Sequence, residues 1–324
     1  MNSINLENTY TSLPQEFFRY TEAETMPDIK LIKINEQLSD LLDIDISFLT
    51  SQAGLRFLSG KNSEFLPNSI SLAYAGHQFG HLVPQLGDGR AVLLGDKICK
   101  DGVRRDIQLK GSGKTYFSRG GDGRAGIGPV IREYLISESM HHLGVPTTRS
   151  LAVLSTGEKV VREEVTPGAM LARVATSHVR VGTFEFFALR NQRDNIRKLA
   201  DFMIERSHPD LSEKKKKYEL FFEKIVIGQA HLVAQWNSVG FIHGVMNTDN
   251  TSISYETIDY GPCAFMDSYE ANKVFSSIDQ FGRYAFSNQA RVAPWNLSRL
   301  AETILFLISE NTSKAIKVVE EILV

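Results

Sequence analysis

The stretch His243-Gly-Val-Met-Asn-Thr-Asp249-Asn250, followed downstream by Asp259-Tyr-Gly, carries the most specific chemistry in this sequence. Asn250 and Asp259 both offer hard oxygen ligands, which suit Mg²⁺ or Mn²⁺ rather than zinc. Asp249 places a second carboxylate directly beside the amide of Asn250. A cluster of this kind predicts a site for a metal-bound nucleotide.

The spacing within this stretch is similar to that of protein kinases, which carry His-Arg-Asp-x-x-x-x-Asn and then Asp-Phe-Gly. In kinases the first Asp orients the attacking hydroxyl, while the Asn and the second Asp hold Mg²⁺. Aligning His243 with the kinase His keeps the interval to Asn250 and places Val245 where the catalytic Asp should stand. Because valine cannot accept a proton, the stretch predicts a reaction other than ordinary phosphorylation, with Asp249 as a displaced proton acceptor.

Length and composition are compatible with two lobes that share a cleft. The 324 residues are 42% hydrophobic, and the formal net charge of −2 gives no bulk reason to expect nucleic acid or a membrane surface. Two cysteines cannot build a disulfide framework or a cysteine-based zinc site. No apolar run approaches the ~18 residues of a membrane span. The first residues have the character of neither a signal nor a transit peptide, so we expect a cytoplasmic protein.

The first half of the chain is predicted to be rich in strands, separated by glycine-rich turns. Alternation and apolar runs indicate strands at 91–94, 107–110, 151–154 and 170–174. The second of these alternates, so that Asp106, Gln108 and Lys110 share one face of the strand.

The second half is predicted to be helical. One earlier helix is expected between Pro129 and Gly144. Residues 218–239 then carry an apolar stripe with a 3.6-residue period, which Gly240 ends. A β-rich first half and a helical second half, with the chemistry near their junction, predict an α+β fold.

A glycine-rich turn, Gln85-Leu-Gly87-Asp-Gly89-Arg90, is a candidate for phosphate binding. Glycine removes the Cβ barrier, so bare backbone amides and the Arg90 side chain can approach an anion closely. An ordinary hairpin turn is the alternative interpretation.

Lys110 and Glu133 are candidates for the strand lysine that contacts nucleotide phosphates and for its ion-pair partner on the next helix. A surface lysine and a surface glutamate are the alternative. The order of these residues before His243–Asn250 favours the first interpretation. Arg173 and Arg180 could form an additional oxyanion pocket, with solvent-exposed arginines as the alternative.

Three short matches to known motifs fail on context. The segment 111–115 lacks the earlier glycine of a Walker A loop, and the segment 121–126 fits the dinucleotide fingerprint but follows no apolar strand. His77 and His81 share the spacing of a zinc-binding helix, yet Gln78 replaces its glutamate, so structural roles are favoured.

Taken together, these segments resemble the selenoprotein O family, a family of pseudokinases and protein adenylyltransferases, over essentially the whole chain from about residue 10. The resemblance is carried by Ala75-Gly-His-Gln-Phe-Gly80, Gln85–Arg90, Gln108-Leu-Lys-Gly111, Gly121-Asp-Gly-Arg124, Ile131-Arg-Glu133, Gly168-Ala-Met-Leu-Ala-Arg173, His243–Asn250, Asp259-Tyr-Gly-Pro262 and Pro294-Trp-Asn. It implies a two-lobed protein-kinase-like fold that binds ATP inverted and transfers AMP to protein hydroxyls.

The resemblance also implies a role for individual residues. Glu133 would pair with Lys110, Asn250 and Asp259 would bind Mg²⁺ or Mn²⁺, and Asp249 would accept the proton. The residues implied to hold the nucleotide are Lys110, Arg173 and Arg180 at the outer phosphates, together with Gly87, Gly89, Arg90, Asp122, Gly123 and Asp259.

We therefore expect residues 1–60 to be an N-terminal extension packed on the core, 61–176 a nucleotide-binding N-lobe, and 177–324 a C-lobe with the catalytic and metal-binding loops. The expected reaction transfers AMP from ATP, or UMP from UTP, to Ser, Thr or Tyr hydroxyls of protein substrates and releases pyrophosphate. Neither nucleic acid nor a membrane is expected as a partner.

Two alternatives to this reaction remain. Family members generally continue into a C-terminal helical region that is expected to be missing here, so a nucleotide-binding pseudokinase scaffold or an inactive truncated fragment is one alternative. An atypical kinase is the other, and Val245 argues against it.

Overall fold

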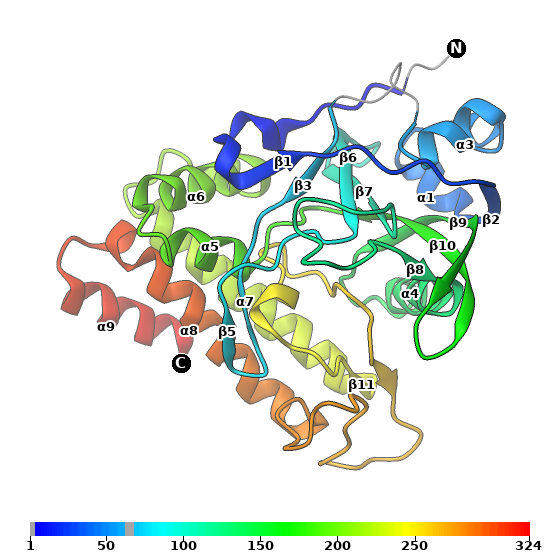
Figure 1. Cartoon of the computed structure of the whole chain (residues 1–324). Coiled ribbons are helices and arrows are strands. Elements are labelled where there is room, and N and C mark those ends of the chain that lie inside the picture. Colours follow the sequence, from blue (N-terminus) through cyan, green and yellow to red (C-terminus); the bar gives the residue numbers. More distant parts are fainter. Residues whose placement is uncertain (1–3, 62–67) are drawn as a thin grey trace. The chain divides into compact units, whose positions relative to one another are not determined.

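The computed structural model describes residues 4–61 and 68–324 (Figure 1). Its elements group into two compact units. The first unit consists of the chain up to Ala73 together with Leu86–His178, and the second consists of Tyr74–Gln85 together with Val179–Val324. Residues 74–85 therefore belong to the same unit as the helical second half.

An antiparallel sheet forms the centre of the first unit. The strand order is β1-β3-β6-β7-β10-β9-β2, and β8 pairs with β10 beside this path. The strands are β1 Phe18–Tyr20, β2 Lys30–Ile34, β3 Ile70–Leu72, β6 Ala91–Ile98, β7 Arg104–Lys110, β8 Ala125–Gly126, β9 Arg149–Val161 and β10 Val165–Ala175. The four strands expected from sequence periodicity fall within β6, β7, β9 and β10.

Helices accompany this sheet in the first unit. Apolar side chains of α1 and α3 share one core cluster with Ile107 and Leu109 of β7. Val130 of α4 packs instead with Val153 and Leu171 in a second, smaller cluster. Because successive residues of a strand point to opposite faces, Gln108, Lys110 and Arg173 lie on the face that α4 covers. The helices are α1 Glu36–Leu41, α2 Ile46–Leu49, α3 Gln52–Leu58 and α4 Ile127–His142.

The helix expected between Pro129 and Gly144 is α4. It begins two residues before Pro129, and Gly144 follows its end with φ +77°, a left-handed conformation that glycine adopts without strain. This helix carries Glu133 on its buried side.

The second unit is mainly helical. The helix expected at 218–239 is α7, and Gly240 follows it with φ +67°. Helix α8 packs against α7, α5 and α9, and it contains Pro294. The helices are α5 Val181–Ala188, α6 Arg193–Ser207, α7 Lys217–Ser238, α8 Gln289–Ile308 and α9 Thr312–Leu323. The expected β-rich first half and helical second half are confirmed.

Two short two-stranded antiparallel sheets belong to the second unit. Strands β4 Gly76–Gln78 and β5 His81–Val83 form one, and β11 Phe241–Ile242 and β12 Ala264–Phe265 form the other. The 3₁₀ turns of the chain are Thr9–Ser12, Gln15–Phe17, Pro209–Leu211, Thr248–Asn250 and Phe286–Asn288.

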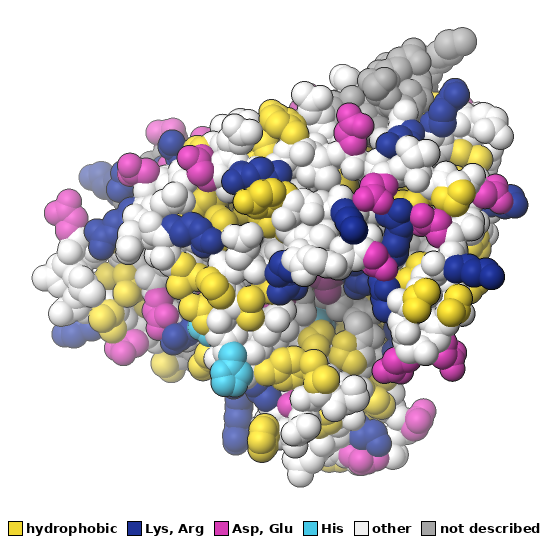
Figure 2. Space-filling model, in the orientation of Figure 1, with side chains coloured by type: hydrophobic (Ala, Val, Ile, Leu, Met, Phe, Trp, Pro, Cys, Tyr) yellow, Lys and Arg dark blue, Asp and Glu magenta, His cyan; other side chains and the backbone are white. Residues whose placement is uncertain are grey.

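The surface carries charges of both signs. Lys and Arg side chains are interspersed with Asp and Glu over the visible face in Figure 2, in line with the net charge of −2. Among the helices of residues 4–61 and 68–324, none is long and apolar enough to cross a membrane.

Candidate active site

The ion pair that the sequence predicts between Lys110 and Glu133 is present in the first unit. Lys110 ends β7, and its Nζ lies 2.6 Å from Oε2 of Glu133 on α4. The two side chains are only 13% and 6% exposed. A charged pair buried to this degree holds its ammonium group in a fixed position, as a ligand for phosphate requires.

Arg173 of β10 extends this pair into a chain of buried polar contacts. It lies directly opposite Gln108 in the sheet, and its guanidinium donates to Oε1 of Gln108 at 2.6 Å and to Oε1 of Glu133 at 3.2 Å. Gln108 Nε2 donates in turn to Oδ2 of Asp88 at 3.0 Å. Arg173 and Gln108 are 1% and 0% exposed. Because unpaired polar groups are costly in such surroundings, these contacts fix the side chains relative to one another.

Two amides of the glycine-rich turn before β6 are already bonded to backbone carbonyls. The amide of Asp88 donates to the carbonyl of Leu72 at 2.9 Å, and that of Gly89 donates to the carbonyl of Gly87 at 2.8 Å. Gly87 has φ +76°, and a Cβ there would lie 2.3 Å from the ring of Phe117, so the turn is held against the fold.

Arg90, Asp122 and Gly123 lie in loops of the first unit. Arg90 directly precedes β6, and Asp122 forms an exposed ion pair with Arg162 at 2.7 Å. The hydrogen bonds from the Arg162 guanidinium lower the pKa of Asp122 to about 2. Gly123 has φ +69°, and a Cβ there would lie 2.0 Å from the carbonyl oxygen of Gly113, so only glycine fits.

Asp249 lies in the second unit, where the 3₁₀ turn Thr248–Asn250 buries its carboxylate. Gln78 of β4 donates Nε2 to Oδ2 of Asp249 at 3.2 Å. The other oxygen, Oδ1, has no hydrogen-bond partner among the residues that the structure describes. Burial raises the pKa of Asp249 to about 6, against the opposing effect of the Arg180 charge. At neutral pH this carboxylate is ionised and has a pKa suited to accepting a proton.

Gly76, also in β4, makes room for this carboxylate. A Cβ at Gly76 would lie 2.5 Å from Oδ1 and 2.8 Å from Cβ of Asp249. Sequence reasoning alone does not find Gly76 or Gln78, because neither carries a group typical of catalysis. Their one signal is their place in the stretch Ala75–Gly80, which contributes to the family resemblance.

Arg180 connects the two loops that carry the sequence motif. Its NH1 donates to the backbone carbonyl of Asp249 at 2.6 Å and to Oδ2 of Asp259 at 2.5 Å. Its Cζ also lies 4.6 Å from the ring centroid of Tyr74. The side chain is 3% exposed. The sequence predicts Arg180 as a phosphate ligand, and these contacts add a structural role because they hold both loops.

Asn250 and Asp259 fit the predicted metal in their donor chemistry. Asn250 uses Nδ2 to donate to the carbonyl of Val245 at 2.9 Å, which leaves Oδ1 as a possible ligand atom. Asp259, at φ +62°, offers a carboxylate that is 21% exposed. Within the described ranges no group of three or more His, Cys, Asp or Glu side chains is placed to hold a metal ion. Mg²⁺ bound to a nucleotide commonly takes one or two protein carboxylates besides phosphate oxygens and water, so a pair of protein oxygens suits that mode.

His243 has a structural role in the loop that carries the motif. It is fully buried, Nε2 lies 2.9 Å from the carbonyl oxygen of Ile258, and its ring stacks on Trp236 with centroids 5.3 Å apart. Burial lowers the pKa of His243, so the imidazole is neutral at physiological pH. Its contacts hold the segments on either side of Asn250.

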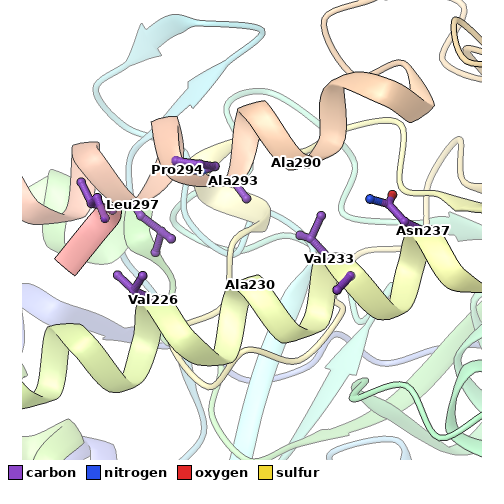
Figure 3. A pocket seen from close by; sticks show the side chains of 10 residues that line it. Val226, Ala230, Val233, Asn237, Ala290, Ala293, Pro294 and Leu297 are labelled. Atoms are coloured by element: carbon purple, nitrogen blue, oxygen red, sulfur yellow. The ribbon is translucent and has the colours of Figure 1, made fainter. Parts of the chain in front are cut away.

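A pocket of about 250 Å³ lies between α7 and α8 in the second unit (Figure 3). Ala230 and Val233 of α7 face Ala293 and Leu297 of α8 across it, and Asn237 lies at one end. None of its lining side chains is titratable. The pocket therefore offers no proton-transfer group and is distinct from the cluster around Asp249.

Comparison with known proteins gives the family. The family model described as protein adenylyltransferase SelO matches residues 1–321. A protein nucleotidyltransferase YdiU of Bradyrhizobium diazoefficiens is 56% identical over 317 residues, covering 98% of this chain and 65% of that protein. Its counterpart in Nitrobacter hamburgensis is 56% identical over 314 residues, covering 97% of this chain and 62% of that protein. Another, in Rhodopseudomonas palustris, is 54% identical over 317 residues, covering 98% and 64%.

This chain thus spans at most 65% of the length of these relatives. The match nevertheless extends over nearly all of the residues that are present, and it includes every segment that carries the candidate site. The chain belongs to the SelO family.

Proposed function

We propose that this chain transfers AMP from ATP to Ser, Thr or Tyr hydroxyls of a protein substrate and releases pyrophosphate. The observation that carries the proposal is the buried carboxylate of Asp249, one oxygen of which has no hydrogen-bond partner among the described residues. Val245 occupies the position at which a kinase has its base. The family and the relatives are named as an adenylyltransferase and as nucleotidyltransferases, and these names support the same reaction class.

In the proposed reaction the substrate hydroxyl oxygen attacks the α-phosphorus. The bond between that phosphorus and the oxygen bridging to the β-phosphorus breaks, and pyrophosphate leaves with the bonding electron pair. Asp249 takes the hydroxyl proton. Its pKa of about 6 keeps the carboxylate ionised at neutral pH and still basic enough to assist.

The charged residues of the first unit are proposed to hold the outer phosphates. Lys110 and Arg173 share the carboxylate of Glu133, so both cations are already oriented before any anion binds. Preorganised cations stabilise the charge that develops on the leaving pyrophosphate. The resemblance adds the remaining residues of the nucleotide site, which are Gly87, Gly89, Arg90, Asp122, Gly123, Arg180 and Asp259.

The two metal ligands proposed are Asn250 and Asp259. A bound Mg²⁺ or Mn²⁺ would neutralise phosphate charge there. Arg180 contacts Asp259 and the backbone of Asp249, so the same residue orients a metal ligand and the proposed base.

We further propose that the fold is protein-kinase-like, with the sheet-containing unit as the N-lobe and the helical unit as the C-lobe. The strand lysine, the helix glutamate, the Asn and the second Asp follow one another in kinase order, which supports this assignment. The chemistry differs from that of kinases because the base has moved from position 245 to position 249.

Incubation with ATP labelled at either the α- or the γ-phosphate tests the proposal. AMP transfer puts α-label and no γ-label on protein. Label from the γ-phosphate would instead show a kinase, and nucleotide binding without either label would show a scaffold. Parallel α-labelled UTP decides which nucleotide the site prefers.

A further inference from the structure

Glu185 of α5 is a buried carboxylate that the proposed chemistry does not use. Its side chain is 5% exposed. Oε1 lies 2.5 Å from Nδ1 of His77 in β4, and Oε2 accepts a hydrogen bond from the hydroxyl of Thr248 at 2.5 Å. One carboxylate therefore joins three elements of the second unit: helix α5, strand β4 and the turn Thr248–Asn250.

The hydrogen bonds among these residues close into a ring. The backbone amide of His77 donates to the Thr248 hydroxyl oxygen at 2.6 Å. The Thr248 hydroxyl donates its hydrogen bond to Glu185 and accepts the His77 amide through a lone pair. The imidazole Nδ1 lies against the other carboxylate oxygen and donates to it in the tautomer that carries the proton on Nδ1. With each group in a defined role, the ring fixes the turn against β4.

The turn Thr248–Asn250 and strand β4 are also in contact one residue further along each segment. Asp249 follows Thr248, and Gln78, which follows His77, donates to Oδ2 of Asp249. Gly76, on the other side of His77, approaches the same carboxylate closely enough to exclude a Cβ. A shift of the turn along β4 would therefore move the Asp249 carboxylate against both neighbours.

Strand β4 is itself held by α8. The His77 ring meets the edge of the Trp295 ring with centroids 5.3 Å apart and an interplanar angle of 90°. The amide of Phe79 also donates to Oδ1 of Asn247, at the start of the turn, at 3.0 Å. Contacts with α8 and with Asn247 thus hold this strand, and Glu185 supplies a side-chain connection from helix α5 to the turn.

We propose that Glu185 is a positioning residue, which acts through Thr248 to set the place of the Asp249 carboxylate. Glu185 makes no contact with Asp249 itself in the hydrogen bonds of the described residues, and it acts only through the ring with His77 and Thr248. This inference rests on the proposed function for its catalytic consequence and on the ring geometry for its structural one.

The first test is kinetic, with α-label transfer from ATP as the assay. Glu185→Ala should lower kcat by about tenfold to a hundredfold while KM for ATP changes by less than about twofold, because the base is misplaced and the nucleotide ligands are not. Glu185→Gln should recover most of the loss. Its oxygen can accept from Thr248, while its amide donates to the other tautomer of His77.

Thr248 supplies the second arm. Thr248→Val removes the hydroxyl at nearly constant volume and should match Glu185→Ala, whereas Thr248→Ser should retain activity. Because both groups act through one ring, the double variant should lose no more than the worse single variant. Thr303→Val is the matched control, since it removes another buried hydroxyl of the second unit, which donates only to the carbonyl of Leu300.

Hydrogen exchange gives a readout that does not depend on the reaction. Glu185→Ala should speed amide exchange in peptides that cover residues 247–251 and leave α8 unchanged. Exchange that stays at the wild-type level there, a uniform rise over the second unit, or equal changes in KM and kcat would overturn the inference. If the wild type transfers no α-label, the proposed function fails, and the exchange result still decides the role of Glu185.

Discussion

The buried charged side chains of the two units differ in how completely they are paired with opposite charges and hydrogen-bond donors. In the first unit, Glu133 binds both Lys110 and Arg173, so that each buried charge faces an opposite one. In the second unit, Asp249 is buried with a single side-chain donor from Gln78, and the structure describes no hydrogen-bond partner for its Oδ1. A paired cluster suits groups that must hold an anion in place. A carboxylate left short of donors suits a group that must take up a proton.

The burial of the Asp249 carboxylate also destabilises the fold locally. Burying an ionised carboxylate with incomplete hydrogen bonding is unfavourable, and the raised pKa of Asp249 expresses that cost. Such local cost is typical of functional sites, where the surrounding structure holds a group in a state that it would not adopt alone.

The largest predicted effect tests the pairing in the first unit. Glu133→Ala removes the buried carboxylate that Lys110 and Arg173 share, and it should lower the free energy of unfolding by about 3–5 kcal/mol. Lys110→Ala should lower it by only about 1–2 kcal/mol, because Glu133 keeps its contact with Arg173. Urea denaturation monitored by circular dichroism measures both changes.

Arg162→Ala is the control for this pair of variants. It breaks the exposed ion pair with Asp122, in which the side chains are 50% and 46% exposed. The free energy of unfolding should therefore change by less than about 1 kcal/mol. Equal losses for Lys110→Ala and Glu133→Ala would show that the shared carboxylate is not the centre of the cluster.

The second prediction concerns the cost of burying Asp249. Folding raises the pKa of Asp249 from 3.8 to about 6. Between these two pH values the unfolded state has already lost the proton that the folded state still holds, so the free energy of unfolding of wild type falls as pH rises. The cost is absent below about pH 4 and complete above about pH 7, where it amounts to about 2–3 kcal/mol. Asp249→Asn does not titrate and should therefore be more stable than wild type at pH 7.5, with the difference shrinking toward pH 4.

Thermal unfolding of both proteins in metal-free buffer, from pH 4 to pH 8, measures this difference. A stability gap between Asp249→Asn and wild type that is independent of pH would contradict the raised pKa. A gap that widens as pH falls would show that folding lowers the pKa of Asp249 instead of raising it.

The third and smallest effect tests the fit of β4 against Asp249. A Cβ at Gly76 would meet Oδ1 and Cβ of Asp249, so Gly76→Ala should displace the carboxylate and lower kcat for α-label transfer about tenfold, with ATP binding retained. Gly128→Ala is the matched control. Gly128 lies in α4 with nothing within 4 Å of a new Cβ, and alanine favours helix there. Wild-type turnover in Gly76→Ala would show that the close approach has no consequence.

Much of the first unit could be predicted from the sequence because its signals are local. Alternation places Lys110 at the end of a strand, and Pro129 with Gly144 brackets the helix that carries Glu133. The kinase order of these residues then predicts that they pair, and they do.

Other features depend on contacts that no local pattern records. Gln108 shares an alternating polar face with Lys110, yet it is fully buried on a central strand, hydrogen-bonded to both Arg173 and Asp88. Asp88 between two glycines has the pattern of an exposed turn, but its carboxylate accepts from Gln108 and from the backbone of Leu72. Gln78 and Asp249 are 171 residues apart in the sequence, so no local pattern shows that Gln78 is the side-chain donor to this carboxylate.

Transfer of α-label from ATP by wild type and by Asp249→Ala, with ATP affinity measured on the same preparations, decides whether Asp249 is the proton acceptor of an AMP transfer. Wild type should place α-label on protein. Asp249→Ala should bind ATP with little change and lose about 10²–10⁴-fold in transfer, the usual cost of a missing general base. Transfer by Asp249→Ala at the wild-type rate would contradict this role, as would a loss that follows weakened ATP binding alone.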